Sequence, residues 1–288
     1  GEFAEVLAAV DDGCGLYDPE THASHKFIYG GHDPIPCGLV FKGLAYWFGG
    51  SYAAAAVACA ASIKQARELE HPFTLALVSA YANRIHYFEG RLDLLGASAE
   101  ELIELCERER FPLWLAFGSV LRGYALAQKG DEDGLKLVES GIALQQRTGS
   151  TLNLPFHKCL LAQAQWRLER KHDALNTLAD AIILSDDHHE GWSEAELHRV
   201  NGEFLRQMGR DFADRAEKAL LRALDVSRRQ QAKAMELRAA TSLARLWRDT
   251  NRRDAARELL PRSLAFCRAD EQANDVRQAR DLLQELSL

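Results

Sequence analysis

The sequence lacks the motifs that mark common catalytic and nucleotide-binding classes. It contains no G-x-x-x-x-G-K-[ST] phosphate loop, no G-x-G-x-x-G motif after a strand pattern and no H-E-x-x-H motif, so nothing in it predicts a nucleotide site or a zinc hydrolase site. We therefore expect no catalytic residues, no cofactor and no enzymatic activity in this chain.

Basic residues are not in excess. There are 35 Lys and Arg against 42 Asp and Glu, which gives a net charge of −7. Binding to nucleic acid needs a clustered basic surface, and arginine pairs such as Arg228-Arg229 are diluted by nearby acids. We expect these stretches to be solvated helix faces, and we expect the chain to bind no nucleic acid.

Closely spaced cysteines are also absent. The six cysteines include no C-x-x-C pair, and most sit among apolar residues, as small buried thiols do: Cys14, Cys37, Cys59, Cys106, Cys159 and Cys267. Zinc sites usually show paired ligands at short spacing, so no metal site is predicted. Isolated thiols suit a reducing compartment, and we expect a cytoplasmic protein.

Three further features invite a functional interpretation that we do not favour. Cys14 could be a nucleophile, but no partner histidine is identifiable from the sequence. His32-Asp33 is better explained as a capped helix start than as an acid–base pair. The cluster from His188 to Glu190 has ligand potential, and we interpret it as an exposed loop before a helix.

No signal peptide or membrane span is predicted. Residues 37–63 carry one charge, Lys42, but they are rich in Ala and Gly and are broken at Gly49-Gly50, which favours two packed helices joined by a tight turn. Residues 1–3 resemble a cloning scar. Because there is no initiator Met, we expect a piece of a longer protein.

Prolines give the first sign of a repeat. Pro34, Pro72, Pro112 and Pro155 each precede an apolar, helix-periodic run, and they recur every 38 to 43 residues. Proline is tolerated in the first turn of a helix and not inside one, so these positions predict helix starts. Asp33 is expected to cap the first helix, and Ser193 to Glu196 reads as a capping box at the fifth start.

A second set of markers has a tighter period. One position per repeat is small except at Asn83, at spacings of 40, 40, 39, 40 and 40: Gly43, Asn83, Gly123, Ala162, Gly202 and Ser242. Seven residues after each marker comes a turn position, which is glycine four times in six, as a helix end prefers: Gly50, Gly90, Gly130, Glu169, Gly209 and Asp249. The two sets of markers predict the same order of elements in each repeat. A first helix, helix A, has a small residue at its middle and ends in a tight turn, and a second helix, helix B, is followed by a loop.

The helix B segments show apolar residues three or four apart. They cover residues 52–68, 135–146, 174–184, 213–229 and 253–266, and a final capping helix is expected over 275–286. No segment alternates with period two, so no sheet is predicted. We expect an all-α fold, a right-handed α-solenoid of about six antiparallel helix pairs.

The predicted domain organisation follows from this register. Residues 4–34 would hold a loop over 11–34 and most of a stray helix that is expected over 2–10, and residues 35–288 would form a single solenoid domain. The repeats are expected near 35–71, 72–110, 112–150, 153–190, 193–231 and 234–268, with a cap at 271–288.

Several strings resemble a known family. Gly43 to Tyr46, with the following Gly50 and Tyr52, is similar to the tetratricopeptide consensus, although these units exceed its usual length. The longer unit resembles the C-terminal repeat domain of large bacterial signalling proteins, on the strings at residues 29–34 (YGGHDP), 71–73 (HPF), 111–114 (FPLW), 194–199 (EAELHR) and 236–247 (ELRAATSLARLW). Glu169 in place of a turn glycine, and residues 269–274, depart from that family's pattern.

This resemblance implies an interaction role. In such proteins an adenylate/guanylate cyclase-type or other output domain and an ATPase module precede the repeats, and ligands of tetratricopeptide domains lie in the groove made by the A helices. Projecting the register onto that groove gives aromatic and charged residues typical of binding hot spots. They are Trp47, Arg84, Tyr87, Tyr124, Trp166, Arg199, Glu203 and Arg206. An alternative is that several of the rings are core between repeats.

Two functions follow as hypotheses. The first is a non-catalytic interaction and regulatory domain, which binds a protein or peptide partner, a second copy of itself as a homodimer, or the upstream domains of its own chain. The second is a small-molecule sensor domain of an ATP-dependent transcription regulator. No membrane partner is expected in either case.

Overall fold

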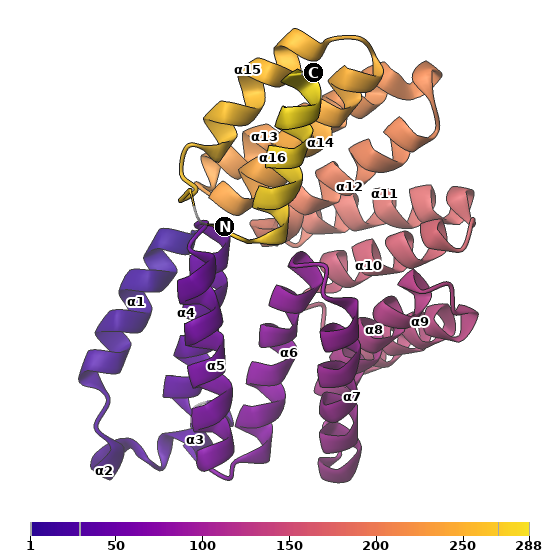
Figure 1. Ribbon diagram of the computed structural model, residues 1–288. Coiled ribbons are helices and arrows are strands. Elements are labelled where there is room, and N and C mark those ends of the chain that lie inside the picture. The colour runs from indigo at the N-terminus through magenta and orange to yellow at the C-terminus, as the bar shows by residue number, and fades with distance from the viewer. Residues whose placement is uncertain (1, 29, 270, 288) are drawn as a thin grey trace. The chain divides into compact units, whose positions relative to one another are not determined.

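The computed structural model describes residues 2–28, 30–269 and 271–287. The described residues form helices joined by short turns, and they contain no strand (Figure 1). Gly1 of the expected scar, Tyr29 of the string at 29–34, and Leu288 at the end of the expected cap lie outside the described residues. The prediction of an all-α repeat of helix pairs is confirmed.

The chain divides into two compact units. The N-terminal unit contains residues 2–47 and 51–152, and the C-terminal unit contains residues 153–288 together with Phe48–Gly50. The expected helix pairs one to three fall in the first unit and pairs four to six fall in the second. The proposal that residues 35–288 act as one domain stays a prediction.

The N-terminal unit begins with three helices that precede the repeats. They are α1 (Phe3–Leu16), α2 (Pro19–His22) and α3 (His25–Ile28). Three helix pairs follow, namely α4 (Pro34–Phe48) with α5 (Tyr52–Glu68), α6 (Pro72–Phe88) with α7 (Leu92–Glu109), and α8 (Pro112–Gln128) with α9 (Glu132–Arg147).

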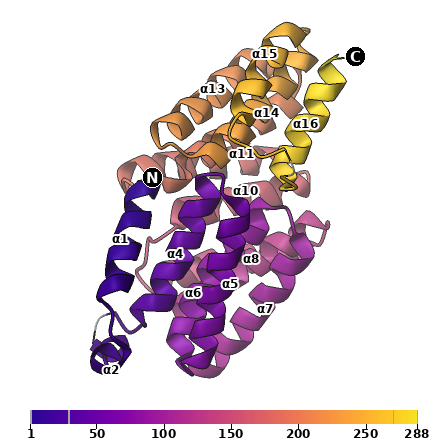
Figure 2. The same ribbon diagram turned by 60° about the vertical axis from the view of Figure 1, so that its left-hand side comes forward.

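The C-terminal unit continues the same order of elements. Its pairs are α10 (Leu154–Arg167) with α11 (Lys171–Asp187), α12 (Glu194–Gln207) with α13 (Ala213–Arg229), and α14 (Lys233–Asp249) with α15 (Arg253–Leu264), followed by α16 (Asn274–Ser287). Short 3-10 turns, Gly191–Ser193 and Arg210–Phe212, precede α12 and α13. The helix A elements also contact one another directly, since α12 packs on α10 and α14 (Figure 1). The last of them, α14, also packs on α16 (Figure 2).

The predicted loop over residues 11–34 is wrong in its first part. Helix α1 continues past Val10 to Leu16, and the one-turn helices α2 and α3 lie within the remainder. Glycines within α1 cost helix stability, but α1 has contacts that offset this cost. The Val10 side chain lies over Gly38 of α4, where a Cβ atom would come within 3.2 Å of Val10 Cγ1, and Asp11 pairs with Lys42.

The helix starts confirm one predicted cap and contradict the other. Asp33 Oδ1 accepts a hydrogen bond of 3.0 Å from the backbone N–H of Ile35, as an N-cap does. The capping box at Ser193 is wrong: the Ser193 side chain caps nothing, although α12 does begin at Glu194. Ser193 ends a 3-10 turn with helical backbone angles, and the carboxylate of Glu196 binds arginines instead.

Five of the six predicted turn positions have a positive φ angle, and in the sixth repeat the residue with positive φ lies two positions later. A left-handed backbone occurs at Gly50, Gly90, Gly130 and Gly209, and also at Glu169, where φ is 61° without a glycine. In the sixth pair α14 runs to Asp249, and the left-handed residue is Asn251. The geometry of the turn is thus kept where the glycine is missing, at a local conformational cost.

Close helix contact explains the small residue at the middle of helix A. A Cβ atom on Gly123 would lie 2.6 Å from the carbonyl oxygen of Gly134 and 2.7 Å from the backbone nitrogen of Val138, both in α9. At Gly202 it would lie 2.5 Å from Leu220 Cγ in α13, and at Gly43 it would collide with Cys59 Sγ in α5. The repeat of small residues therefore sets how near helix B can come.

The lengths and the hydropathy of the helices bear on the predicted absence of a membrane span. No described helix is both long enough and apolar enough to cross a bilayer. Residues 37–63 divide between α4 and α5, with the turn at Gly49-Gly50, as predicted.

Candidate functional site

The predicted groove residues of the N-terminal unit are buried. Trp47 is 1% exposed, and Tyr87, Tyr124 and Arg84 are also buried. The Trp47 ring stacks on Phe88 with centroids 4.4 Å apart, and Tyr87 meets Tyr124 edge-on at 5.3 Å. Rings from successive A helices therefore pack on one another, which was the alternative interpretation of these positions. In the described structure they do not line an open surface.

Arg84 and Trp166 are held by ring contacts as well. The guanidinium of Arg84 lies 4.4 Å from the centroid of Tyr81. Trp166 of α10 is half-buried and stacks almost parallel on Phe204 of α12, at 4.1 Å. Its Nε1 donates a hydrogen bond of 2.9 Å to Gln207. The Trp166 contacts join α10 to α12, whereas the Arg84 contact lies within α6.

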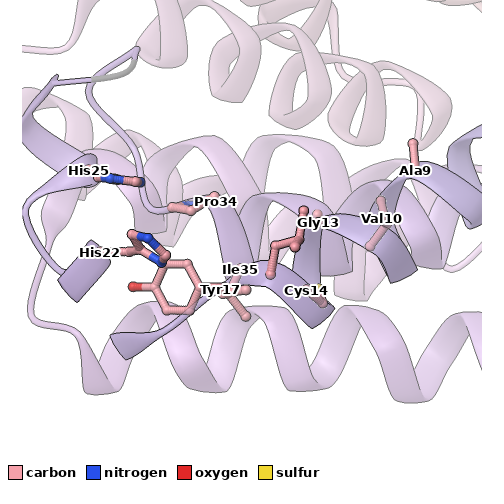
Figure 3. A pocket seen from close by; sticks show the side chains of 11 residues that line it. Ala9, Val10, Gly13, Cys14, Tyr17, His22, His25, Pro34 and Ile35 are labelled. Carbon is pink, nitrogen blue, oxygen red and sulfur yellow. The ribbon is translucent and has the colours of Figure 1, made fainter. Parts of the chain in front are cut away.

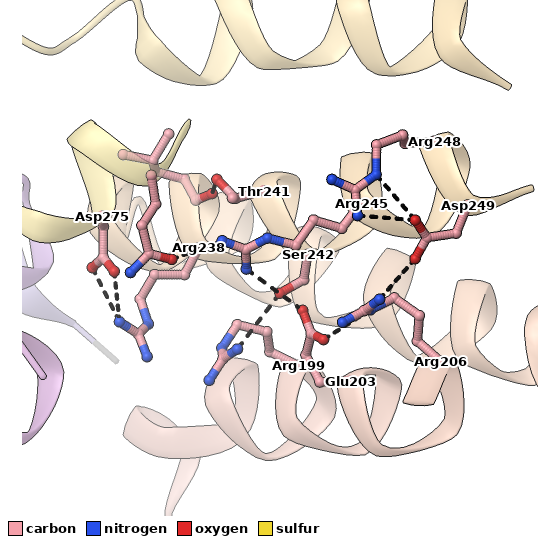
Figure 4. A network of polar contacts seen from close by, with 12 residues as sticks. Arg199, Glu203, Arg206, Arg238, Thr241, Ser242, Arg245, Arg248, Asp249 and Asp275 are labelled. Carbon is pink, nitrogen blue, oxygen red and sulfur yellow. Dashed lines mark hydrogen bonds and ion pairs between the residues drawn. The ribbon is translucent and has the colours of Figure 1, made fainter. Parts of the chain in front are cut away.

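The other three predicted residues meet in a charged surface of the C-terminal unit. Arg199, Glu203 and Arg206 on α12 join side chains from α14 and α16 in what we call the arginine network (Figure 4). Its cations are Arg199, Arg206, Arg238, Arg245 and Arg248, and its anions are Glu196, Glu203, Asp249, Asp275 and Glu285.

One end of the arginine network is built on Glu196. This carboxylate is 0% exposed and accepts two hydrogen bonds of 2.7 Å from Arg199 and one of 2.9 Å from Arg238. Arg238 also donates to Asp275 of α16 at 2.9 Å. Burial by itself would raise the pKa of Glu196, but the two guanidinium groups outweigh it and hold the pKa well below its ordinary value.

The opposite end of the network is nearer to solvent. Arg206 donates to Glu203 at 3.0 Å and to Asp249 at 2.7 Å. Arg248 binds Asp249 and reaches Glu285 of α16 at 2.9 Å. Burial opposes the charge on Glu203, but Arg206 and other donors outweigh it and lower the pKa of this carboxyl.

Arg245, between these ends, has the weakest carboxylate partner of the five arginines. It donates at 2.7 Å to the neutral side-chain oxygen of Gln278, and its nearest carboxylate contact in the described chain, to Glu203, is 3.9 Å long. Burial and the charges of Arg199, Arg206 and Arg248 lower the pKa of Arg245, although Glu203 opposes them. Its side chain is 29% exposed, so an anion arriving from solvent can reach it.

Sequence reasoning found only part of this site. Arg238 and Arg245 follow Arg199 and Arg206 by 39 residues each, which is one repeat with a shift of one position. The 40-residue step of the register leads instead from Arg199 and Arg206 to Ala239 and Leu246, which the structure buries. A search for charged residues at a spacing of 39 residues, as well as 40, would have found both arginines.

A pocket lies among the helices that precede the repeats. A pocket of about 440 Å³ between α1, α2, α3 and α4 is lined by side chains that include Cys14, Tyr17, His22 and His25 (Figure 3). Tyr17 Oη donates to Asp33 at 3.2 Å, and the rings of His22 and His25 lie 4.7 Å apart. In Figure 3 both histidines lie away from Cys14, so the pocket does not present a thiol paired with a base.

The remaining candidate residues have structural contacts. Glu190 accepts hydrogen bonds from the backbone of Asn153 at 3.0 Å and from Trp192 Nε1 at 2.9 Å, which ties the loop to the start of α10. His188 and His189 are exposed. Among the residues that the structure describes, no group of three or more His, Cys, Asp or Glu side chains could hold a metal ion.

Comparison with known proteins gives no activity to transfer. No family model matches the chain. An uncharacterized protein of Rhizobium meliloti (strain 1021) is 23% identical over 247 residues, which cover 85% of this chain and 24% of that relative. The chain therefore spans about a quarter of the length of the curated relative that it matches.

Proposed function

We propose that this chain is a regulatory interaction domain, and that it binds a protein partner through the arginine network on α12, α14 and α16. The observation that carries the proposal is Arg245. It is a half-buried cation among three other arginines, and its only carboxylate contact in the described residues is 3.9 Å long. A carboxylate on a partner would supply the missing short, charge-assisted hydrogen bond.

The surroundings of Arg245 also favour a macromolecular partner. The arginine network extends over three helices, and its ends are fixed by Glu196 and by Glu285. Arginine is enriched at protein interfaces because its rigid fork recognises carboxylates bidentately. An acidic segment of a partner, or of an upstream ATPase or cyclase-type domain of the same longer chain, fits this surface.

The experiment compares two arginine variants of the full chain. A partner is first captured from the source organism by crosslinking, and its affinity for the purified chain is then measured directly. Arg245→Ala should weaken binding at least about tenfold, the effect of one charge-assisted hydrogen bond. Arg222→Ala on α13, outside the network, is the matched control. Equal affinity of both variants and the wild type would refute the assignment.

A further inference from the structure

A polar pocket in the N-terminal unit lies outside the arginine network and the predicted groove. It has a volume of about 260 Å³ and lies between α5, α6 and α7. Ile63, Leu102 and Leu105 give it apolar walls, and α6 contributes Ser79, Asn83 and His86. The pocket thus joins helix B of the first pair to both helices of the second.

Asn83 is the polar centre of this pocket. It is 3% exposed, and its Oδ1 accepts a hydrogen bond of 2.7 Å from Ser98 Oγ. Its Nδ2 has no hydrogen-bond partner among the described residues. A buried donor without an acceptor costs about 1 to 3 kcal/mol, so this amide offers a ready hydrogen bond to an oxygen atom that enters the pocket.

His86 adds a second polar group without adding charge. Its Nδ1 is buried and also has no hydrogen-bond partner within the described chain. Burial and the neighbouring charge of Arg91 lower the pKa of this imidazole, which is therefore neutral at neutral pH. The polar base of the pocket consists of uncharged groups.

The charges at the rim cancel. Arg67 reaches across the pocket from α5 to Glu101 on α7 at 3.3 Å. The remaining charged lining residues are Glu104 and Arg108, so two arginines stand against two glutamates. A charged ligand would lose hydration without gaining an unbalanced counter-charge, and this arrangement favours an uncharged one.

We propose that this pocket binds a small uncharged molecule with one carbonyl-type oxygen on an apolar body. The oxygen accepts a hydrogen bond from Asn83 Nδ2, and the body lies between Ile63, Leu102 and Leu105. The volume is below the usual range of about 300 to 1,000 Å³ for drug-sized ligands, so the molecule is smaller than these. The site is separate from the partner surface proposed above.

The experiment measures the binding of four matched probes to the full chain, by thermal shift and by NMR titration. Benzamide and cyclohexanone carry the carbonyl oxygen, benzoate carries a charge, and toluene has no acceptor. Benzamide and cyclohexanone should raise the melting temperature. Toluene should bind about tenfold more weakly, the factor that corresponds to one neutral hydrogen bond. Benzoate should also bind more weakly, because its charge loses hydration and meets no unbalanced counter-charge in the pocket.

Two variants locate the binding. Asn83→Leu removes the donor and should weaken benzamide about tenfold while leaving toluene unchanged. Ser79→Leu fills the pocket and should abolish binding of all probes, whereas Ser140→Leu on the exposed face of α9 controls for the added leucine. If Asn83→Leu does not fold, the comparison of benzamide with toluene on the wild type and on Ser79→Leu decides the question.

Three results would overturn the proposal. The first is the absence of binding by either carbonyl probe. The second is equal binding of benzamide and toluene, or unchanged binding by Ser79→Leu. The third is a crystal structure, grown with benzamide, in which only a water molecule bridges Asn83 and His86.

Discussion

Glu196 gives the sharpest test of the arginine network, because its carboxylate is fully buried between two guanidinium groups. Replacement of Glu196 by Gln keeps the shape of the side chain but removes the charge, and it leaves Arg199 and Arg238 without their shared partner. Breaking a buried ion pair from one side typically costs about 3 to 5 kcal/mol. We expect the free energy of unfolding to fall by about that amount, and the melting temperature by about 10 °C.

The assay is urea unfolding followed by circular dichroism, with Glu285→Gln as the matched control. Glu285 also binds an arginine, Arg248, but its side chain is 52% exposed. An exposed ion pair contributes up to about 1 kcal/mol, so the control should change little. If Glu196→Gln loses no more stability than Glu285→Gln, the reasoning about the buried end of the network is refuted.

The pH dependence of the same variant gives an independent check. The folded state lowers the pKa of Glu196 below its ordinary value of 4.5. Its contribution to stability is therefore present above the unfolded pKa, and it is lost as the pH falls toward the folded pKa. The wild type should lose this increment on acidification below about pH 4.5, whereas Glu196→Gln should not.

The remaining predictions concern packing, pH and thiol chemistry. Gly123→Ala should destabilise the fold by about 1 to 3 kcal/mol, because its Cβ would collide with the backbone of α9. Gly13→Ala, where a Cβ meets no atom within 4 Å, should instead stabilise α1 by up to about 1 kcal/mol, and chemical denaturation distinguishes the two. The pKa of His86 in the folded state is lowered from the ordinary value of 6.5, so the free energy of unfolding should fall as the pH drops below 6.5. The His86→Gln variant should show a flatter dependence of stability on pH. Burial raises the pKa of Cys106 to about 12, so iodoacetamide should modify it only after unfolding; rapid modification of the folded chain, seen by mass spectrometry, would contradict this.

The accuracy of the sequence predictions differed between the helices and the surface. Residues 52–68 and 213–229 were placed as helices by apolar spacing alone, and α5 and α13 have those bounds. Local rules were sufficient there, because proline, glycine and side-chain periodicity act within one or two turns. They failed at α1, since the approach of Val10 to Gly38 and the pairing of Asp11 with Lys42 join residues far apart in the sequence.

The predicted site residues divide between core and surface for a different reason. Periodicity places Trp47 and Arg199 alike on a helix A face, but it cannot say what covers that face. In the structure Phe88 of the next repeat stacks on Trp47, whereas Arg199 meets the carboxylate of Glu196 beside it. Whether a ring is core or surface depends on its neighbour one repeat away.

The sequence alone therefore determined the helical class, the 40-residue period and the small residues at which the helices of a pair approach. These depend on backbone sterics and on hydrophobic spacing along one helix. Only the tertiary structure decided that the arginines of α12 and α14 share carboxylates, and that Asn83 lies in a pocket with an unused donor. Both outcomes depend on how neighbouring helices are placed against one another, because hydrogen bonds require a distance and a direction that a repeat register does not contain.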